Sequence, residues 1–267
     1  MAISIEEQPA GKTAASGSRP AGTGDAREAA TRVREMFTRI APRYDFLNHL
    51  LSFGMDHLWR WRTARRFRGI LERPEARVLD ICCGTGDLAF ALERLRAQAV
   101  HGTGRDYAAV IGSDFVEPML VRAREKAASV KAGAQFAAAD ALRLPFADAS
   151  FDLVTTAFGF RNLASYEDGL REFARVLKPG GEVGILEFSE PTGVMAGVFR
   201  FYFRHILPRV GRAISGNSEA YAYLPNSVAK FPSSSELAAL MEKSGFGGVK
   251  VTSWNFGSVL LHSARRV

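Results

Sequence analysis

From Pro74 onward, short apolar runs alternate with stretches of helical spacing, and this alternation constrains the fold more than any other feature. Helices are predicted at 87–98, 118–130, 166–176 and 234–244. Strands are predicted at 77–82, 109–115, 134–138, 151–157, 182–188, 249–254 and 258–264. Such alternation is typical of an α/β fold, in which helices cover both faces of a mainly parallel sheet. The last two strands are close enough in sequence to form a hairpin, so one antiparallel edge strand is expected.

Three segments lie outside this alternation. Residues 1–27 are rich in Ala, Gly, Ser, Thr and Pro and predict a disordered tail before a single domain at 28–267. Residues 28–72 have helical spacing that Pro42 interrupts, and they predict a helical cap. A long insertion at 191–232 separates the fifth and sixth strands. The cap and the insertion are expected over the carboxyl ends of the strands, where open α/β sheets bind ligands.

The first predicted strand runs into a turn with two glycines, VLDICCGTGD at 78–87. Such glycines let backbone N–H groups approach a ligand closely, so a dinucleotide, a phosphate or S-adenosylmethionine could bind there. The dinucleotide pattern is only partly matched, and the Walker A pattern fails because no Lys-Ser/Thr pair follows. The better match is the methyltransferase pattern acid-x-x-x-Gly-x-Gly, which Asp80, Gly84 and Gly86 supply.

Two further acids follow predicted strands, Asp114 after the second and Asp140 after the third. An acid at the end of the second strand can accept hydrogen bonds from both ribose hydroxyls, as in nucleotide-binding folds. An acid after the third strand can meet the adenine amino group. We therefore interpret Asp80, Asp114 and Asp140 as contacts of an S-adenosylmethionine site. The alternative is that these aspartates only cap helices or turns.

Charge and the numbers of cysteines and histidines limit the classes of function. The net charge of +7 suits an anionic membrane surface or nucleic acid, but it is also common in soluble enzymes. The two cysteines are adjacent, which excludes a disulfide framework, and the histidines are scattered, so no metal site is predicted. No apolar run fits a signal peptide or a membrane span. We therefore expect a cytoplasmic protein whose membrane contact, if present, is peripheral.

A set of longer motifs makes the sequence recognisable. They are MFTRIAPRYDFLN (36–48), SFGMDHLWRWR (52–62), DICCGTGDLA (80–89), LPFADASFD (144–152), FGFRNL (158–163), RVLKPGG (175–181) and LEFSEP (186–191). With these motifs, the chain from Ala29 to its end resembles the ubiquinone/menaquinone biosynthesis C-methyltransferase family. The resemblance implies a class I S-adenosylmethionine-dependent methyltransferase fold, which is Rossmann-like, and methylation of a ring carbon of a prenylated quinol.

The resemblance also implies cofactor contacts, position by position. Besides the acid and glycines of the turn, they are Thr85, Asp114, Asp140, Ala141 and Ala157. Two positions depart from the wider pattern. Cys82 stands where that pattern has its first glycine, and Ala157 stands where some relatives have serine. A contact at Ala157 would therefore come from the backbone.

The chemistry of a quinol carbon suggests candidate catalytic residues after the fourth strand. Ionisation of a ring hydroxyl makes the neighbouring carbon nucleophilic, so the site must favour a phenolate and exclude water. Arg161 could stabilise the phenolate, and Asn162 could donate a hydrogen bond to a ring oxygen. Alternatively, Arg161 only pairs with an acid such as Glu187 and orders the loop. Tyr44 and Asp45, within the first motif, could orient substrate or have a structural role.

The insertion carries a further pattern. Residues 194–212 have apolar side chains at helical spacing with arginines between them. They predict either a lid over the prenyl tail with a basic rim toward anionic lipid, or an amphipathic helix packed on the core. KFPSSSEL at 230–237 is similar to the menaquinone-only members of the family. We therefore expect demethylmenaquinol as substrate, with the benzoquinol intermediate of ubiquinone synthesis as the alternative.

Other functions on the same fold predict different patterns. An O- or N-methyltransferase for another small molecule and a nicotinamide-dependent oxidoreductase remain alternatives. A nucleic-acid amino-methyltransferase is disfavoured, because its [DN]-P-P-[YF] motif would stand where this chain has FGFR at 158–161. No nucleic-acid partner is expected, and the sequence makes no prediction of the oligomeric state.

Overall fold

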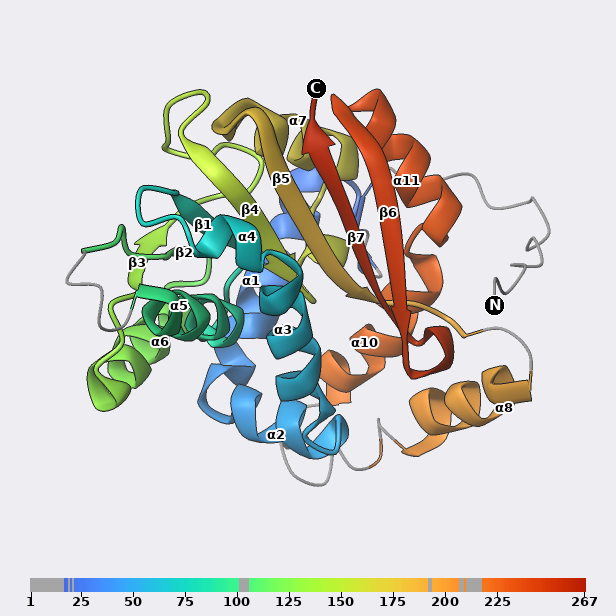
Figure 1. Cartoon of the computed structure of the whole chain (residues 1–267). Coiled ribbons are helices and arrows are strands. Elements are labelled where there is room, and N and C mark those ends of the chain that lie inside the picture. Colours follow the sequence, from blue (N-terminus) through green and yellow to red (C-terminus); the bar gives the residue numbers. More distant parts are fainter. Residues whose placement is uncertain are drawn as a thin grey trace.

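The computed structural model describes residues 17, 18, 20, 22–100, 106–191, 194–206, 209 and 218–267. Its centre is a seven-stranded sheet in the order β3-β2-β1-β4-β5-β7-β6 (Figure 1). The strands are β1 (Val78–Ile81), β2 (Ile111–Asp114), β3 (Gln135–Ala138), β4 (Phe151–Ala157), β5 (Leu177–Phe188), β6 (Phe246–Trp254) and β7 (Val259–Arg266). The predicted α/β fold is confirmed.

The helices lie before, between and after these strands. The α-helices are α1 (Ala26–Ile40), α2 (Tyr44–Leu51), α3 (Met55–Arg66), α4 (Arg68–Leu71), α5 (Asp87–Val100), α6 (Glu117–Val130), α7 (Tyr166–Val176), α8 (Val194–Phe201), α10 (Ser218–Lys230) and α11 (Ser234–Lys243). The shorter 3-10 turns are η1 (Ala41–Arg43), η2 (Phe160–Asn162) and η4 (Asn255–Gly257), and η3 (Tyr202–Ile206) is a π-helical turn.

Strands β1 to β5 run parallel, and the predicted hairpin of the last two strands is present as β6 and β7. The antiparallel strand is β7, which lies between β5 and β6, one position in from the edge of the sheet. The side chains from Val259 to Ala264 are all buried, whereas most of β6 is partly or fully exposed. The strand that is buried on both faces therefore takes the inner position.

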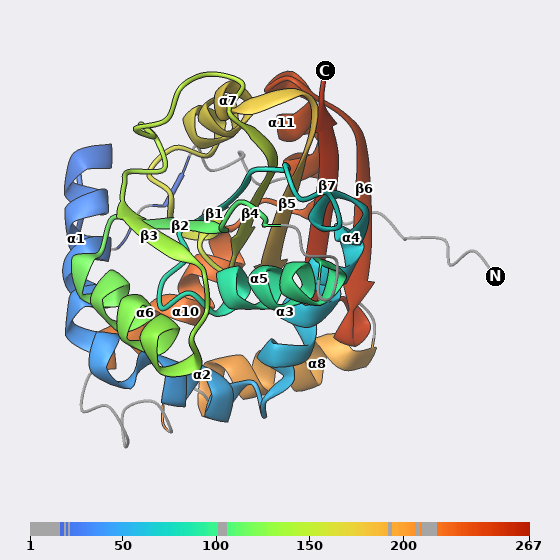
Figure 2. The same ribbon diagram turned by 60° about the vertical axis from the view of Figure 1, so that its left-hand side comes forward.

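Alternation along β1 divides the core between the two faces of the sheet. Leu79 and Ile81 pack with residues of α7 and α11, while Val78 packs with residues of α3, α4 and α5. Because successive strand side chains point to opposite faces, one short apolar strand serves both layers. The two layers of helices are visible in Figure 2.

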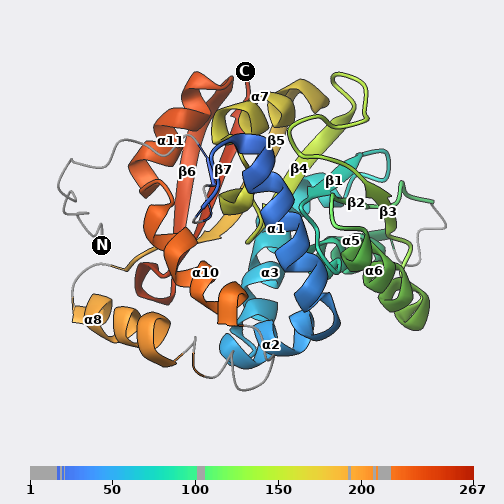
Figure 3. The same cartoon turned by 180° about the vertical axis from the view of Figure 1, so that it is seen from behind.

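The N-terminal helices form where the spacing of apolar residues predicts them. Asp25 caps α1 by accepting a hydrogen bond from the backbone N–H of Glu28 at 2.8 Å. The buried face of α1 consists of Ala29, Val33, Met36 and Ile40, and the helix ends just before Pro42. Figure 3 shows α1 beside α10, with α2 at the end of the sheet where the parallel strands finish.

Part of the predicted tail contacts the domain. Residues 1–16 lie outside the described part of the chain, but Ser18 is buried. Its N–H donates to the carbonyl of Leu163 at 2.7 Å, and its hydroxyl lies 2.8 Å from the hydroxyl of Tyr223. A Cβ at Gly17 would lie 2.0 Å from the carbonyl oxygen of Ala164. Positions 17 and 18 of the predicted tail therefore pack against the domain.

The insertion at 191–232 contains α8, η3 and α10, and residues 192, 193, 207, 208 and 210–217 lie outside the described part. The predicted helix at 194–212 is thus seen only as α8 and the π-helical turn η3. Among the described residues, each helix is too short or too polar to cross a lipid bilayer.

Candidate active site

A cavity lies between α1 and the carboxyl ends of the parallel strands. The predicted site residues that line it are Tyr44, Asp80, Gly84, Thr85, Asp114, Asp140, Ala141, Ala157 and Asn162. Three others stand outside the lining, namely Asp45, Gly86 and Arg161. The structure therefore brings the strand-end acids together, as expected for carboxyl ends at one edge of a sheet.

The glycine turn has the backbone geometry that its residues predict. Gly84 and Gly86 have φ values of 55° and 89°, in the left-handed region that favours glycine. A Cβ on Gly86 would lie 2.9 Å from the ring of Phe136, so no side chain fits there. Gly84 lines the cavity and donates its N–H to Asp114 at 2.8 Å. Gly84 thus faces the ligand space, and Gly86 shapes the turn from behind.

Gly159 leaves room for Cys82, the residue that stands in place of the first glycine of the wider pattern. Cys82 has a φ of 53°, and a Cβ at Gly159 would lie 2.4 Å from the Cβ of Cys82. The FGF stretch after β4 therefore needs its glycine. Burial raises the pKa of Cys82 and of Cys83 well above the usual thiol value. Both thiols stay protonated at neutral pH and are poor nucleophiles.

Asp80 is a buried carboxyl group with one unsatisfied oxygen. Its Oδ1 accepts a hydrogen bond from the Thr155 hydroxyl at 2.8 Å, but no described residue donates to Oδ2. Burial raises the pKa of Asp80 to about 7, despite the hydrogen bond from Thr155. A cationic ligand group beside Oδ2 would favour the ionised form. The ammonium group of S-adenosylmethionine has the charge and donors for this position.

Asp114 and Asp140 already accept hydrogen bonds from backbone N–H groups. Asp114 accepts from the N–H groups of Gly84 and Val116, at 2.8 and 2.9 Å, and burial raises its pKa. Asp140 is exposed and accepts from the N–H of Leu142 at 2.9 Å. Both acids therefore make the turn contacts of the alternative interpretation. Each carboxylate oxygen has a further lone pair, so ribose and adenine contacts remain available.

Small side chains complete this part of the cavity. Ala141 and Ala157 line it, and Ala157 ends β4. Their small side chains leave the neighbouring backbone accessible to a ligand. Together with the unsatisfied oxygen of Asp80, these residues fit S-adenosylmethionine.

Arg161 and Asn162 have different environments, although they are adjacent. Arg161 is buried, pairs with Glu187 at 2.9 Å and donates to the carbonyl of Phe158. Asn162 lines the cavity, and its Oδ1 accepts from the hydroxyl of Tyr223 at 3.0 Å. The geometry therefore favours the second interpretation of Arg161, in which it pairs with Glu187 and orders the loop.

Tyr44 and Asp45 also differ in placement. The ring of Tyr44 lines the cavity, and burial raises its pKa although Arg161 and Arg60 act in the opposite direction. Asp45 stands behind the lining and accepts a hydrogen bond from the hydroxyl of Thr85 at 2.5 Å. Thr85 therefore lines the cavity while its hydroxyl fixes the cap helix α2 to the glycine turn.

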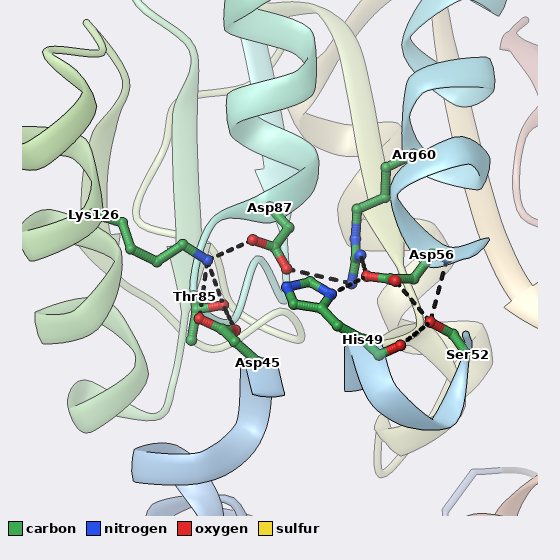
Figure 4. Close-up of polar contacts among 8 residues, drawn as sticks. All are labelled: Asp45, His49, Ser52, Asp56, Arg60, Thr85, Asp87 and Lys126. Carbon is green, nitrogen blue, oxygen red and sulfur yellow. Dashed lines mark hydrogen bonds and ion pairs between the residues drawn. The ribbon is translucent and has the colours of Figure 1, made fainter. Parts of the chain in front are cut away.

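A polar network around this contact includes residues that the sequence analysis did not identify (Figure 4). Lys126 on α6 lies 2.5 Å from Asp87 and 3.0 Å from Asp45. Asp87 also lies 3.6 Å from Arg60 on α3, which in turn pairs with Asp56. The network ties α2 and α3 of the cap to the first residue of α5. The i,i+4 spacing of Asp56 and Arg60 is a signal for their pair, whereas nothing in the sequence points to Lys126.

Two histidines that are separated in the sequence lie together, because the turn between α2 and α3 brings them into contact. The rings of His49 and His57 stack with centroids 4.2 Å apart, and His49 Nδ1 lies 2.7 Å from Asp56 Oδ2. The ligand atoms of these three residues lie within 4.8 Å of one another. Spacing along the sequence therefore does not reveal this cluster. Arg60 already balances the charge of Asp56. Burial alone would raise the pKa of this acid, but Arg60, Ser52 and His49 together outweigh burial and lower it to about 2.

Helix α1 supplies a wall of the cavity, of which the quoted motifs include only Phe37. Its lining residues are Ala30, Val33, Arg34 and Phe37. Their spacing of three and four residues places them on one helix face. Phe37 also meets the ring of Tyr44 edge-on, with centroids 5.9 Å apart. The cavity is therefore polar along the strand ends and largely apolar along the cap.

Comparison with known proteins agrees with this geometry. The sequence pattern of the ubiE/COQ5 methyltransferase family matches residues 25–266. The chain is 49% identical over 224 residues to a protein of Deinococcus radiodurans named demethylmenaquinone methyltransferase, covering 84% of this chain and 88% of that protein. It is 41% identical over 244 residues to a Geobacter sulfurreducens protein named ubiquinone/menaquinone biosynthesis C-methyltransferase UbiE, covering 90% of each.

A solved structure shares the fold at much lower identity. The crystal structure of an S-adenosylmethionine-dependent methyltransferase from Aquifex aeolicus superposes with a TM-score of 0.58 at 18% identity. It covers 84% of this chain and 98% of that one, and such a likeness shows the fold alone. The family match extends over the whole cavity, so S-adenosylmethionine is the methyl donor. This chain belongs to the ubiE/COQ5 methyltransferase family.

Proposed function

We propose that this chain methylates a ring carbon of a prenylated quinol and that its substrate is demethylmenaquinol. The observation that carries this proposal is the 49% identity to the D. radiodurans protein named demethylmenaquinone methyltransferase. Identity to the G. sulfurreducens protein, whose name includes both quinones, is lower at 41%. The cavity supports the proposal because it joins a cofactor site to an apolar wall.

The residues of the apolar wall suit a flat ring. When bound, S-adenosylmethionine supplies a methyl group on a positively charged sulfur. Phe37, Phe158 and Leu163 line the cavity and exclude water from the space beside that group. Asn162 accepts from the hydroxyl of Tyr223 through Oδ1, so its amide N–H groups can donate to a ring oxygen. A donor to that oxygen stabilises the phenolate that makes the carbon nucleophilic.

The remaining predicted residues support this arrangement. We assign substrate orientation to Tyr44, which stays protonated at neutral pH because burial raises its pKa. Asp45 acts through Thr85 and has a structural role. Arg161 is proposed as a positioning residue that fixes the loop of Asn162 through Glu187. The alternative, direct stabilisation of the phenolate, would act through space, as the Arg161 charge does on Tyr44.

The benzoquinol intermediate of ubiquinone synthesis is the second candidate substrate, because the G. sulfurreducens relative is named for both pathways. An O-methyltransferase for another small molecule would use the same cofactor site. The atom that receives the methyl group distinguishes C-methylation from O-methylation, and the relative rates with the two quinols distinguish the two C-methylations.

The test uses the purified chain, methyl-labelled S-adenosylmethionine and short-chain quinols kept reduced with dithionite. We expect label on the unsubstituted ring carbon of demethylmenaquinol, located by mass spectrometry and NMR. Faster C-methylation of the benzoquinol would support the ubiquinone pathway. Label on oxygen would contradict C-methylation.

We also propose that the chain works as a peripheral protein on the cytoplasmic face of a membrane, since a long prenyl tail keeps its quinol within the bilayer.

A further inference from the structure

Two phenylalanines combine unfavourable backbone geometry with solvent exposure. Phe53 has a φ of 52° and Phe256 has a φ of 57°, both in the left-handed region that bulky side chains rarely adopt. They are also the two most exposed phenylalanines among the described residues, at 81% and 78%. Glycine or asparagine would suit either backbone better. Among the described residues, the one ring contact of these two side chains is that of Phe53 with Tyr202, so most of both rings stays exposed to solvent. We therefore look for the benefit of these residues outside the folded chain.

Both residues lie at the same end of the molecule. Phe53 occupies the turn between α2 and α3, and Phe256 occupies the tip of the β6–β7 hairpin. In Figures 1 and 3, that turn, that tip and α8 are found at the end opposite to the C-terminus. The exposed side chains of these segments form what we call the apolar rim, composed of Phe46, Leu50, Phe53, Val198, Phe201 and Phe256.

Direct contacts join some of these segments to neighbouring parts of the chain. The ring of Phe53 lies 6.0 Å from that of Tyr202, centroid to centroid, and the Tyr202 hydroxyl donates to the carbonyl of Leu51 at 2.7 Å. At the hairpin, Ser189 donates its N–H to the carbonyl of Ser258 at 3.0 Å. The exposed apolar residues therefore lie on segments at one end of the molecule, and exposed apolar surface gathered in this way marks an interaction site.

The charge around the apolar rim is positive. The stretch from Val194 to Arg209 contains no Asp or Glu, and Arg200 and Arg209 are exposed in it. Along α2 and α3 the acids are Asp45 and Asp56, and both are engaged with cations of the polar network. Exposed apolar side chains flanked by arginines match a bilayer that contains anionic lipids.

The apolar surface continues inward to the cavity. Phe199, Tyr202 and Leu51 belong to the same packed cluster as Met119 and Phe37. The last two of these residues line the cavity. A packed apolar cluster therefore extends from segments of the apolar rim to the wall of the space proposed for the quinol ring.

We propose that the apolar rim docks this protein onto an anionic lipid bilayer, with Phe53 and Phe256 inserted as anchors. The route it offers to a prenyl tail rests on the proposed function, whereas docking itself does not. Membrane insertion offsets both costs, because it buries the exposed parts of the two rings. The chain would then receive its substrate through the face that touches the lipid.

The test measures binding of the full chain to vesicles without quinol. The vesicles consist of phosphatidylcholine with about 30% phosphatidylglycerol, and sedimentation reports the bound fraction. The double variant Phe53→Asn, Phe256→Asn should bind at least about tenfold more weakly. Its melting temperature should be unchanged or higher, because asparagine tolerates the left-handed backbone. Val267→Ser is the matched control, since Val267 is 83% exposed at the opposite end and should not affect binding.

Further measurements distinguish an anionic bilayer from a second copy of the chain as the partner of the apolar rim. Binding should weaken in about 1 M NaCl and in Arg200→Gln, Arg209→Gln, because both reduce attraction to anionic lipid. Equal vesicle binding by the phenylalanine variant and the wild type would overturn the proposal. So would self-association without vesicles that the same variant abolishes, since the rim would then be a subunit interface. Turnover of a short-chain quinol without vesicles should be the same in the variant. A wild type that binds vesicles but methylates no quinol would contradict the proposed function alone.

Discussion

Arg161 and Glu187 form an ion pair inside the protein, with Nη1 of the arginine 2.9 Å from Oε2 of the glutamate. The backbone N–H of Arg161 donates to the other glutamate oxygen at 3.0 Å, so β5 holds the loop after β4 by two contacts. That loop carries Phe158 and Asn162 into the cavity. A buried pair of this kind is sensitive to the loss of one partner, because the remaining charge is left without compensation.

Arg161→Met is therefore expected to lower the free energy of unfolding by about 3–5 kcal/mol. The double variant Arg161→Met, Glu187→Met should recover most of this stability, because no charge stays buried alone. If Arg161 is a positioning residue, the double variant also regains methyl transfer to within about tenfold of the wild type. Denaturant titration and single-turnover rates across pH measure both effects. A stable double variant that remains about 1000-fold slow at neutral pH, and recovers as pH rises, would assign Arg161 to phenolate stabilisation.

The raised pKa of Asp80 predicts that the protein releases a proton when the cofactor binds. Burial gives Asp80 a pKa of about 7, and contact with an ammonium group favours the carboxylate. Binding at about pH 6 should release up to one proton, and affinity should rise by up to about tenfold per pH unit until the pH passes the pKa. Calorimetry in buffers of different ionisation enthalpy measures the proton count. Asp80→Asn is the control and should bind more weakly without proton release. Wild-type binding without proton release would exclude this role.

The same group affects stability in the absence of cofactor. Its folded-state pKa of about 7 lies above the ordinary value of 3.8. The folded state therefore holds its proton more tightly than the unfolded state, and stability falls as pH rises from 3.8 to about 7. Asp80→Asn should remove this decline.

His262 on β7 predicts a loss of stability in acid. Burial lowers its pKa from 6.5 to about 4, so the folded protein holds it neutral. Its contribution is fully present above pH 6.5 and is lost as pH falls toward 4, by up to about 3 kcal/mol. His262→Gln should flatten this part of the stability profile, measured by denaturant titration at several pH values. Identical slopes for the variant and the wild type would show that other groups cause the acid sensitivity.

Ser18 tests whether the segment before α1 supports the site. Ser18→Ala removes the contact with the Tyr223 hydroxyl and should cost about 0.5–1.5 kcal/mol of stability. The Michaelis constant for quinol should also rise, because Tyr223 orients Asn162. Removal of residues 1–16 is the matched control, since it keeps Ser18. Unchanged stability and kinetics in Ser18→Ala would make the contact irrelevant to function.

Most of the sheet is predictable because each buried strand is a short apolar run between helical stretches. The start of β5 is an instructive exception. The Lys-Pro-Gly-Gly stretch is typical of a turn, and the sequence predicts a strand only from Glu182. In the structure the strand begins at Leu177, which pairs with Phe151 before the register shifts. Pairing across the sheet extends a strand that local composition would end earlier.

The site residues likewise include some that the nearby sequence predicts and others that come together only when distant segments pack. Asp80, Asp114 and Asp140 are predictable, because the carboxyl ends of parallel strands meet at one edge. Arg60 and Lys126 could not be predicted as neighbours of Asp87, since they come from α3 and α6 and meet only after packing. The environment of Arg161 likewise depends on its pairing with Glu187, which the sequence offers only as one of two alternatives.

The order of the last two strands in the sheet is the reverse of the order in which they are synthesised. Strand β6 is synthesised first but has no partner in the sheet until β7 follows and inserts against β5. The strands from β1 to β5 can pair as soon as they emerge, whereas β6 and the helix α11 before it must wait for the last strand. A ribosome that stops within the hairpin would therefore release a chain with the cofactor edge formed but with β5 still open to pairing with other chains.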